Sequence, residues 1–327
     1  MEPHKPEPWL RPIVGGLAVL VTLLVVVGLA IREPRPHDIP VGVSGPAAAV
    51  DPLVAGFGQN APGAFAFTTY ASEAEALTAI DNRDVVGALV VGPAGPRLVI
   101  AAGAGEAVTG AVSGAFSAAF AGQGTELAVE VVHPLPAGDA HGILLFFLIL
   151  ATAVASVVAG AAAAMGRPGR RWGSDIVLLA TFAVSAGIVG VAMAAWLASG
   201  YGDGVWAAMG IAALLALAVS LVAAAAARWL GAGGVALAAA VVVLLGLVSS
   251  GGPLGSAFLP DAYRAIAPWL PVAPAVDAMR SALAFDSVGL LAPTAVLLGW
   301  ATIGLVGLAA VDLARRPVAV RPEVAVA

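Results

Sequence analysis

Six long runs of apolar residues divide this chain, and polar or mixed sequence separates them. The runs cover residues 13–31, 142–165, 176–199, 205–227, 235–249 and 290–311. Most are about 20 residues long, which is the length at which an α-helix crosses a hydrocarbon core of about 30 Å. The pattern predicts an all-α membrane bundle of six transmembrane helices, whose many Ala and Gly residues let the helix backbones approach closely.

Residues 32–141 interrupt this pattern with short alternating segments, prolines, glycines and acidic residues. Such a stretch is typical of a small α/β domain in water, here inserted between the first and second transmembrane helices. Ser72 and Glu75 form a capping box at the start of one helix, which ends at Asp81-Asn82. The other predicted helices cover 51–59 and 106–121, and the strands cover 39–44, 64–70, 85–91, 97–102 and 127–132.

The stretch 251–289 is neither a span nor an ordinary loop. Prolines begin and end its short helices, and Tyr263 and Trp269 suit a membrane interface. In a helix over 274–285, Asp277 and Arg280 share the polar face at a spacing that permits an ion pair. One interpretation is an amphipathic lid on the outer surface of the bundle. The other is an outer gate formed by Pro271, Asp277 and Arg280, in which Arg280 meets an anionic group.

Composition supports a membrane protein and narrows its chemistry. Hydrophobic residues make up 60% of the chain and charged residues 11%, and the mean hydropathy is +0.98, which excludes an ordinary soluble domain. The net charge of −5 is dispersed, so no basic patch indicates nucleic acid. The absence of cysteine excludes disulfides and thiol chemistry. No motif indicates a cofactor.

Basic residues are denser on one side of the predicted spans. One side holds Lys5, Arg11, Arg167, Arg170, Arg171, Arg228, Arg315, Arg316 and Arg321, and the other holds Arg32, Arg35, Arg83, Arg97, Arg264 and Arg280 on much longer segments. The positive-inside rule then places the termini, 1–12 and 313–327, in the cytoplasm and residues 32–141 outside. A cleaved signal peptide ending near Gly28-Leu29-Ala30 is an alternative for the first run, but the run is long for a signal core.

No energy source is encoded in the predicted spans. The only lysine is Lys5, which excludes a phosphate-binding Walker A loop. Asp175, Asp203, Arg228 and Asp312 lie at span ends, where snorkelling to the interface explains them, so proton coupling is disfavoured. No span carries a nucleophile with a base, which argues against an intramembrane enzyme.

His133, Asp139 and His141 fall close together in the link between the aqueous domain and the second span. His and Asp side chains are metal ligands, so a metal site is one interpretation. No third histidine lies nearby, however, and the simpler interpretation is a connector at the lipid headgroups without a metal.

Two segments stand out by their motifs: VHPLPAGD at 132–139, and the run 259–280 with LP, APWLP and AMR before the last span. They resemble permeases of the ATP-binding-cassette type 2 (ABC-2) exporter superfamily, closest to its YhgE/phage-infection-protein branch. The helix-then-strand element over 72–91 is also similar. The order of one span, an outer domain and five spans matches that branch.

The resemblance implies export of a hydrophobic or amphipathic molecule by a homo- or heterodimer, powered by a separate ATPase subunit in a bacterial plasma membrane. The ATPase would dock on the loop 166–174, with Arg167, Arg170 and Arg171, although this loop is short and its arginines also serve as topology determinants. Only a proline-rich dozen residues precede the first span, where such permeases usually have an amphipathic helix. The alternative is a non-transporting, membrane-anchored surface scaffold, secretion accessory or phage-receptor-like protein.

Overall fold

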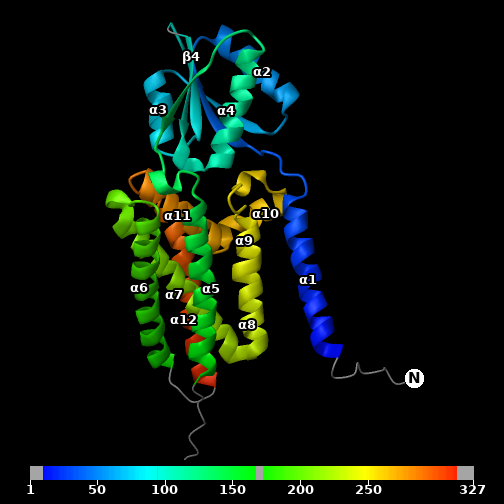
Figure 1. The fold of residues 1–327 in the computed structure, drawn as a ribbon, viewed down its shortest axis with the longest axis vertical. Helices are drawn as coiled ribbons and strands as arrows, with labels where there is room; N and C mark the ends of the chain where they lie inside the picture. Colours follow the sequence, from blue (N-terminus) through cyan, green and yellow to red (C-terminus); the bar gives the residue numbers. More distant parts are fainter. Residues whose placement is uncertain (1–9, 94, 167–171, 315–327) are drawn as a thin grey trace, which may run out of the picture.

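The computed structural model describes residues 10–93, 95–166 and 172–314, and it consists of a helical bundle with a small sheet domain at one end (Figure 1). The bundle helices are α1 Leu10–Ile31, α5 Ile143–Met165, α6 Trp172–Leu197, α7 Val205–Leu230, α8 Ala232–Ala238, α9 Gly246–Ser249, α10 Asp261–Ile266, α11 Val272–Ala284 and α12 Leu291–Ala314. The described residues contain six helices long and apolar enough to cross a membrane: α1, α5, α6, α7, α12 and the continuous stretch Ala232–Ser249, in which a π-helix over Ala239–Leu245 joins α8 to α9. This confirms the predicted six apolar helices and is consistent with a multi-pass membrane protein.

The sheet domain contains five strands in the order β2-β1-β3-β4-β5. The strands are β1 Ile39–Ser44, β2 Phe65–Tyr70, β3 Gly87–Gly92, β4 Gly95–Ala101 and β5 Ala128–Val132. β1 is parallel to β2 and to β3, β3 and β4 form an antiparallel hairpin, and β5 is parallel to β4. The predicted alternation of strands and helices along this part of the chain is confirmed.

Alternating side chains of the strands form two apolar layers. Helices α2 Ala47–Asn60 and α4 Glu106–Ala121 cover the face that carries Val41 and Leu89, and α3 Glu73–Asp81 covers the opposite face, which carries Ala88 and Val99. The predicted capping box is present: the backbone N–H of Glu75 donates to Ser72 Oγ at 3.2 Å. The Glu75 carboxylate in turn accepts from the backbone N–H of Ala71 at 3.1 Å, one residue before the position that the motif predicts.

Helix α7 is the centre of the bundle and packs against α5, α6, α11 and α12. Of its most apolar stretch, 61% is buried, compared with 6% for α1. Three neighbours approach α7 through glycines: a Cβ added at Gly160 of α5, Gly187 of α6 or Gly304 of α12 would lie 2.3 to 2.6 Å from a backbone atom of α7. Small residues at such crossings let helices pack in lipid, where hydrophobicity alone does not drive association.

Helix α1 stands apart from the other spans along most of its length (Figure 1). Its contacts lie near its end, where Ala30 is buried with Val248 and Leu259, and where Tyr263 Oη donates to the carbonyl of Val26 at 2.7 Å. Apolar side chains along the rest of α1, such as Leu24 at 65% exposure, are uncovered. This surface requires lipid or another apolar partner.

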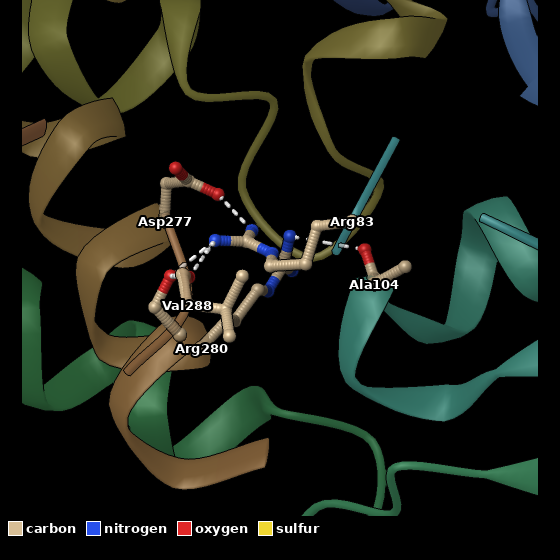
Figure 2. Close-up of polar contacts among 6 residues, drawn as sticks. Arg83, Ala104, Asp277, Arg280 and Val288 are labelled. Atoms are coloured by element: carbon tan, nitrogen blue, oxygen red, sulfur yellow. Dashed lines mark hydrogen bonds and ion pairs between the residues drawn. The ribbon is translucent and has the colours of Figure 1, made fainter. Parts of the chain in front are cut away.

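Helix α11 is buried more deeply than a lid resting on the bundle. Val272, Ala275, Ala278 and Met279 are fully buried within the main core of the bundle, together with residues of α5 and α7. The prediction of a surface lid is therefore wrong for this helix. Its polar face points to the sheet domain instead, with Asp277 and Arg280 at the junction of the two parts (Figure 2).

Three ionisable residues expected to snorkel lie together at the bundle end remote from the sheet domain. Arg228 of α7 makes ion pairs with Asp175 of α6 and, at 2.6 Å, with Asp312 of α12. The side chain of Asp175 is fully buried and that of Arg228 is 8% exposed. Asp312 also accepts the backbone N–H of Trp172 at 2.7 Å. Helix α6 begins at Trp172, before the predicted residue 176, so Asp175 lies within its first turn.

Loss of Arg228 is expected to destabilise the bundle strongly. Arg228→Met removes the cation that pairs with the fully buried Asp175 and the partly buried Asp312, which costs about 3–5 kcal/mol. The triple variant Arg228→Met with Asp175→Asn and Asp312→Asn removes all three charges and is expected to recover most of this loss. Thermal unfolding of the purified protein in detergent measures both, with Arg35→Gln, at an exposed site, as the control. An Arg228→Met variant as stable as wild type would contradict the prediction.

Candidate functional site

Two of the three residues proposed from sequence for a gate, Asp277 and Arg280, lie at the junction between α11 and the sheet domain. Pro271 immediately precedes α11, while Asp277 and Arg280 lie on its polar face. Proline at this position suits a helix start, because the first N–H groups of a helix have no partner within it. The arginines predicted to dock an ATPase, Arg167, Arg170 and Arg171, lie outside the described residues.

Asp277 pairs with the sheet domain and not within its own helix. Its Oδ1 lies 2.5 Å from Nη2 of Arg83, whereas no contact within 4.0 Å joins it to Arg280. The predicted ion pair three residues apart is therefore wrong. The physical reason is that Arg83 competes with Arg280 for the Asp277 carboxylate. Arg83 reaches α11 from the sheet domain, and its side chain is only 18% exposed. This pair joins the two parts of the molecule (Figure 2).

Arg83 is positioned by the end of α3. Its φ of +66° is in the left-handed region, which commonly ends a helix but is more often occupied by Gly or Asn. The guanidinium also donates to Ser281 Oγ and lies 4.9 Å from the centroid of the Phe285 ring. One side chain of the sheet domain therefore makes an ion pair, a hydrogen bond and a cation–π contact with α11 and the residue that follows it.

Arg280 has fewer partners than Arg83. Its Nη1 donates to the carbonyl of Ala104 at 3.3 Å, and its buried Nε has no hydrogen-bond partner in the described part of the chain. Burial lowers the pKa of Arg280; the Asp277 carboxylate opposes this effect and the Arg83 charge adds to it. A cation in this setting is held without full compensation.

The backbone beside Arg280 leaves room only for glycine. A Cβ at Gly105 would lie 2.9 Å from Arg280 Nη2, and Gly105 has a φ of +112°, which other residues rarely adopt. A Cβ at Gly103 would lie 2.5 Å from Cβ of Ala284. The short turn after β4 thus sits directly against α11.

Two cavities meet at this junction. The larger, of about 320 Å³, lies between α11, α12 and the segment before α11, and its lining is mostly Ala, Pro and Val. The smaller, of about 220 Å³, lies between the sheet domain and α11. Ser256, Asp277 and Arg280 line both. These residues therefore lie between a mostly apolar space in the bundle and a space under the sheet domain that is also lined by the charged Asp38 and Arg83.

The three residues considered as metal ligands have different partners. His133 Nε2 lies 2.8 Å from Asp81 Oδ1, and its ring stacks on Phe285. Asp139 caps α5 by accepting the backbone N–H groups of Leu144 and Leu145. His141 Nδ1 lies 2.8 Å from Glu106. No group of three or more His, Cys, Asp or Glu side chains suited to a metal occurs among the described residues.

The sequence signal for Arg83 was present but incomplete. The end of α3 is visible in Asp81-Asn82, yet nothing local indicates that the next residue reaches a helix almost two hundred positions later. A second link, the 2.9 Å ion pair between Arg264 of α10 and Asp38, has the same long range.

Neither a protein-family model, nor a curated protein, nor a solved structure matches this chain.

Loss of Arg83 is expected to loosen the sheet domain on the bundle. A partly buried hydrogen bond to a charged group contributes about 1.5–3 kcal/mol, so Arg83→Gln should raise amide hydrogen exchange in residues 281–289 about 10- to 100-fold. Hydrogen exchange with mass spectrometry measures this. The control is Arg97→Gln, because Arg97 makes its ion pairs with Glu73 and Glu130 inside the sheet domain. Equal exchange in both variants would show that Arg83 does not hold the junction.

Proposed function

We propose that this chain is the membrane permease subunit of an ABC-2-like exporter in a bacterial plasma membrane, with the sheet domain outside the cell and both termini in the cytoplasm. It moves a hydrophobic or amphipathic substrate and works as a homo- or heterodimer powered by a separate ATPase subunit. The resemblance of residues 132–139 and 259–280 to such permeases supports the family.

The observation that carries the proposal is the arrangement at the junction. A mostly apolar cavity in the bundle and a second cavity under the sheet domain share Asp277 and Arg280, and Asp277 is tied to the sheet domain through Arg83. Movement of the sheet domain on α11 would break this tie and join the two spaces. Pro271, Asp277 and Arg280 with Arg83 then form an outer gate that opens when the sheet domain moves.

The energy for this movement must come from a partner, because the chain has no Walker A lysine. The charged cluster of Asp175, Arg228 and Asp312 joins α6, α7 and α12 at the bundle end that we place in the cytoplasm. A push on the start of α6 would reach α7 through Asp175. Helix α7 packs in turn on α11, which carries the gate.

The proposed orientation has a direct test, because the chain contains no cysteine. Gln59 is exposed at the end of α2 in the sheet domain, and Ala232 is exposed at the turn between α7 and α8. A membrane-impermeant maleimide should label Gln59→Cys in intact cells and Ala232→Cys only after permeabilisation. The reverse pattern would place the sheet domain in the cytoplasm and remove the outer gate.

The proposed ATPase partner is tested by affinity purification from native membranes in mild detergent, with mass spectrometry of the co-purified chains. Wild type should recover a cassette ATPase, and the triple variant of Arg167, Arg170 and Arg171 to Ala should lose it. The variant Arg32→Ala with Arg35→Ala removes exposed arginines near the other end of the bundle and should retain it. Recovery of surface or secretion components alone, without an ATPase, would overturn the exporter.

One observation favours the second candidate, a membrane-anchored surface scaffold. Strand β5 is an edge of the sheet, and Val129 and Val131 on it are 41% and 57% exposed. Exposed apolar edge strands are surfaces to which other chains add. In this reading the sheet domain binds a partner and the bundle anchors it, which is the outcome that recovery of surface components alone would support.

A further inference from the structure

We propose that the junction holds a binding site for an anionic amphiphile, whose phosphate or carboxylate head pairs with Arg280 and whose alkyl chain lies in the apolar cavity between α11 and α12. The binding itself does not depend on transport. The statement that this amphiphile is the exported substrate rests on the proposed function.

The charges at the junction leave one cation in excess. Arg83 and Asp277 neutralise each other at 2.5 Å, and Asp38, in the lining of the smaller cavity, pairs with Arg264 at 2.9 Å. Among the residues that the structure describes, no carboxylate lies within 4.0 Å of the Arg280 guanidinium. A cation shielded from water is costly unless it is paired. An anion bound beside Arg280 would supply the missing partner.

Arg280 also has donors to spare. An arginine side chain carries five N–H donors in a planar fork that matches phosphate and carboxylate oxygens. In the described part of the chain the one hydrogen bond of Arg280 runs from Nη1 to the carbonyl of Ala104, at 3.3 Å, and Nε is buried without a hydrogen-bond partner. Ser256 lines both cavities beside it. The head group would take these donors at the shared wall.

The larger cavity suits an alkyl chain. Apart from Ser250, Ser256, Asp277 and Arg280, its lining is apolar and includes Pro268, Ala273, Pro274, Ala292, Pro293 and Val296. Small-molecule sites have volumes of roughly 300–1,000 Å³, mostly apolar walls and a few polar groups that orient the ligand. A cavity of about 320 Å³ with its charge at one end fits a molecule that is apolar along its length and anionic at its tip.

The test measures equilibrium binding of radiolabelled decyl phosphate to the full-length protein in phosphatidylcholine nanodiscs, with empty nanodiscs subtracted. Decanol, the uncharged analogue, should bind at least tenfold more weakly. Arg280→Gln should weaken decyl phosphate binding about 10- to 100-fold, the effect of losing charge-assisted hydrogen bonds, and Arg280→Lys should weaken it less. The matched control is Arg264→Gln, because Arg264 already has the carboxylate of Asp38 as its partner.

A second variant addresses the alkyl chain and guards against misfolding of the Arg280 variants. Ala273→Phe fills the apolar cavity while Arg280 stays in place, and it should also lower binding at least tenfold with an unchanged thermal unfolding temperature. Equal binding of decyl phosphate and decanol, or unchanged binding to Arg280→Gln, would overturn the proposal. So would an Arg264→Gln variant that loses as much affinity as Arg280→Gln.

The source of the anion is separated by a second arm. Nanodiscs containing phosphatidylglycerol are analysed by native mass spectrometry for lipid that remains bound. Retention that Arg280→Gln abolishes identifies a lipid head group as the ligand, and decyl phosphate binding without such retention identifies a free amphiphile. Binding that depends on Arg280 in a protein that recovers no ATPase would keep the site and reject the exporter. Recovery of an ATPase partner without such binding would support the exporter and reject the site.

Discussion

Backbone contact between α7 and its three neighbours is the constraint on which the bundle depends. Gly160, Gly187 and Gly304 bring α5, α6 and α12 so close that even a methyl group would collide with α7. Close approach extends van der Waals contact along the helices, which matters where the surrounding lipid is as apolar as the protein. Helix α11 packs on α7 and α5 in its turn, so the packing around α7 also positions the junction residues of α11.

Helix α7 connects two charged clusters at opposite ends of the bundle, since it carries Arg228 at one end and packs on α11 near the other. At one end Arg228 holds Asp175 and Asp312, and each of the three residues comes from a different span. At the other end Arg83 holds Asp277, so the sheet domain and α11 meet through a fixed polar contact. Between them the core is formed by small and branched apolar side chains. The ion pairs between elements thus lie at the two ends of the bundle, where each cluster fixes the relative position of neighbouring elements.

Local patterns predicted most of the elements, whereas long-range contacts escaped them. Alternation along the strands, the Ser72 cap and the apolar runs identified both the sheet domain and the six long helices, because those signals reside in neighbouring residues. Local patterns did not predict the partner of Asp277, because Arg280 is near it in sequence whereas Arg83 comes near only after folding. The ion pairs of Arg228 were missed for the same reason, because the sequence around a charged residue at a span end is the same whether its side chain faces water or another helix. The roles proposed for Arg167, Arg170 and Arg171 stay predictions.

The isolation of α1 has a consequence for how this sequence tolerates change. Its side chains meet nothing of the described chain over most of its length, so Leu, Ile, Val and Phe are interchangeable there as long as the segment stays apolar. In α7 half of the positions are buried against neighbouring helices, and a larger side chain has no space to occupy there. Two helices of similar hydropathy therefore tolerate substitution differently: the exposed length of α1 has room for other apolar side chains, while the buried positions of α7 do not.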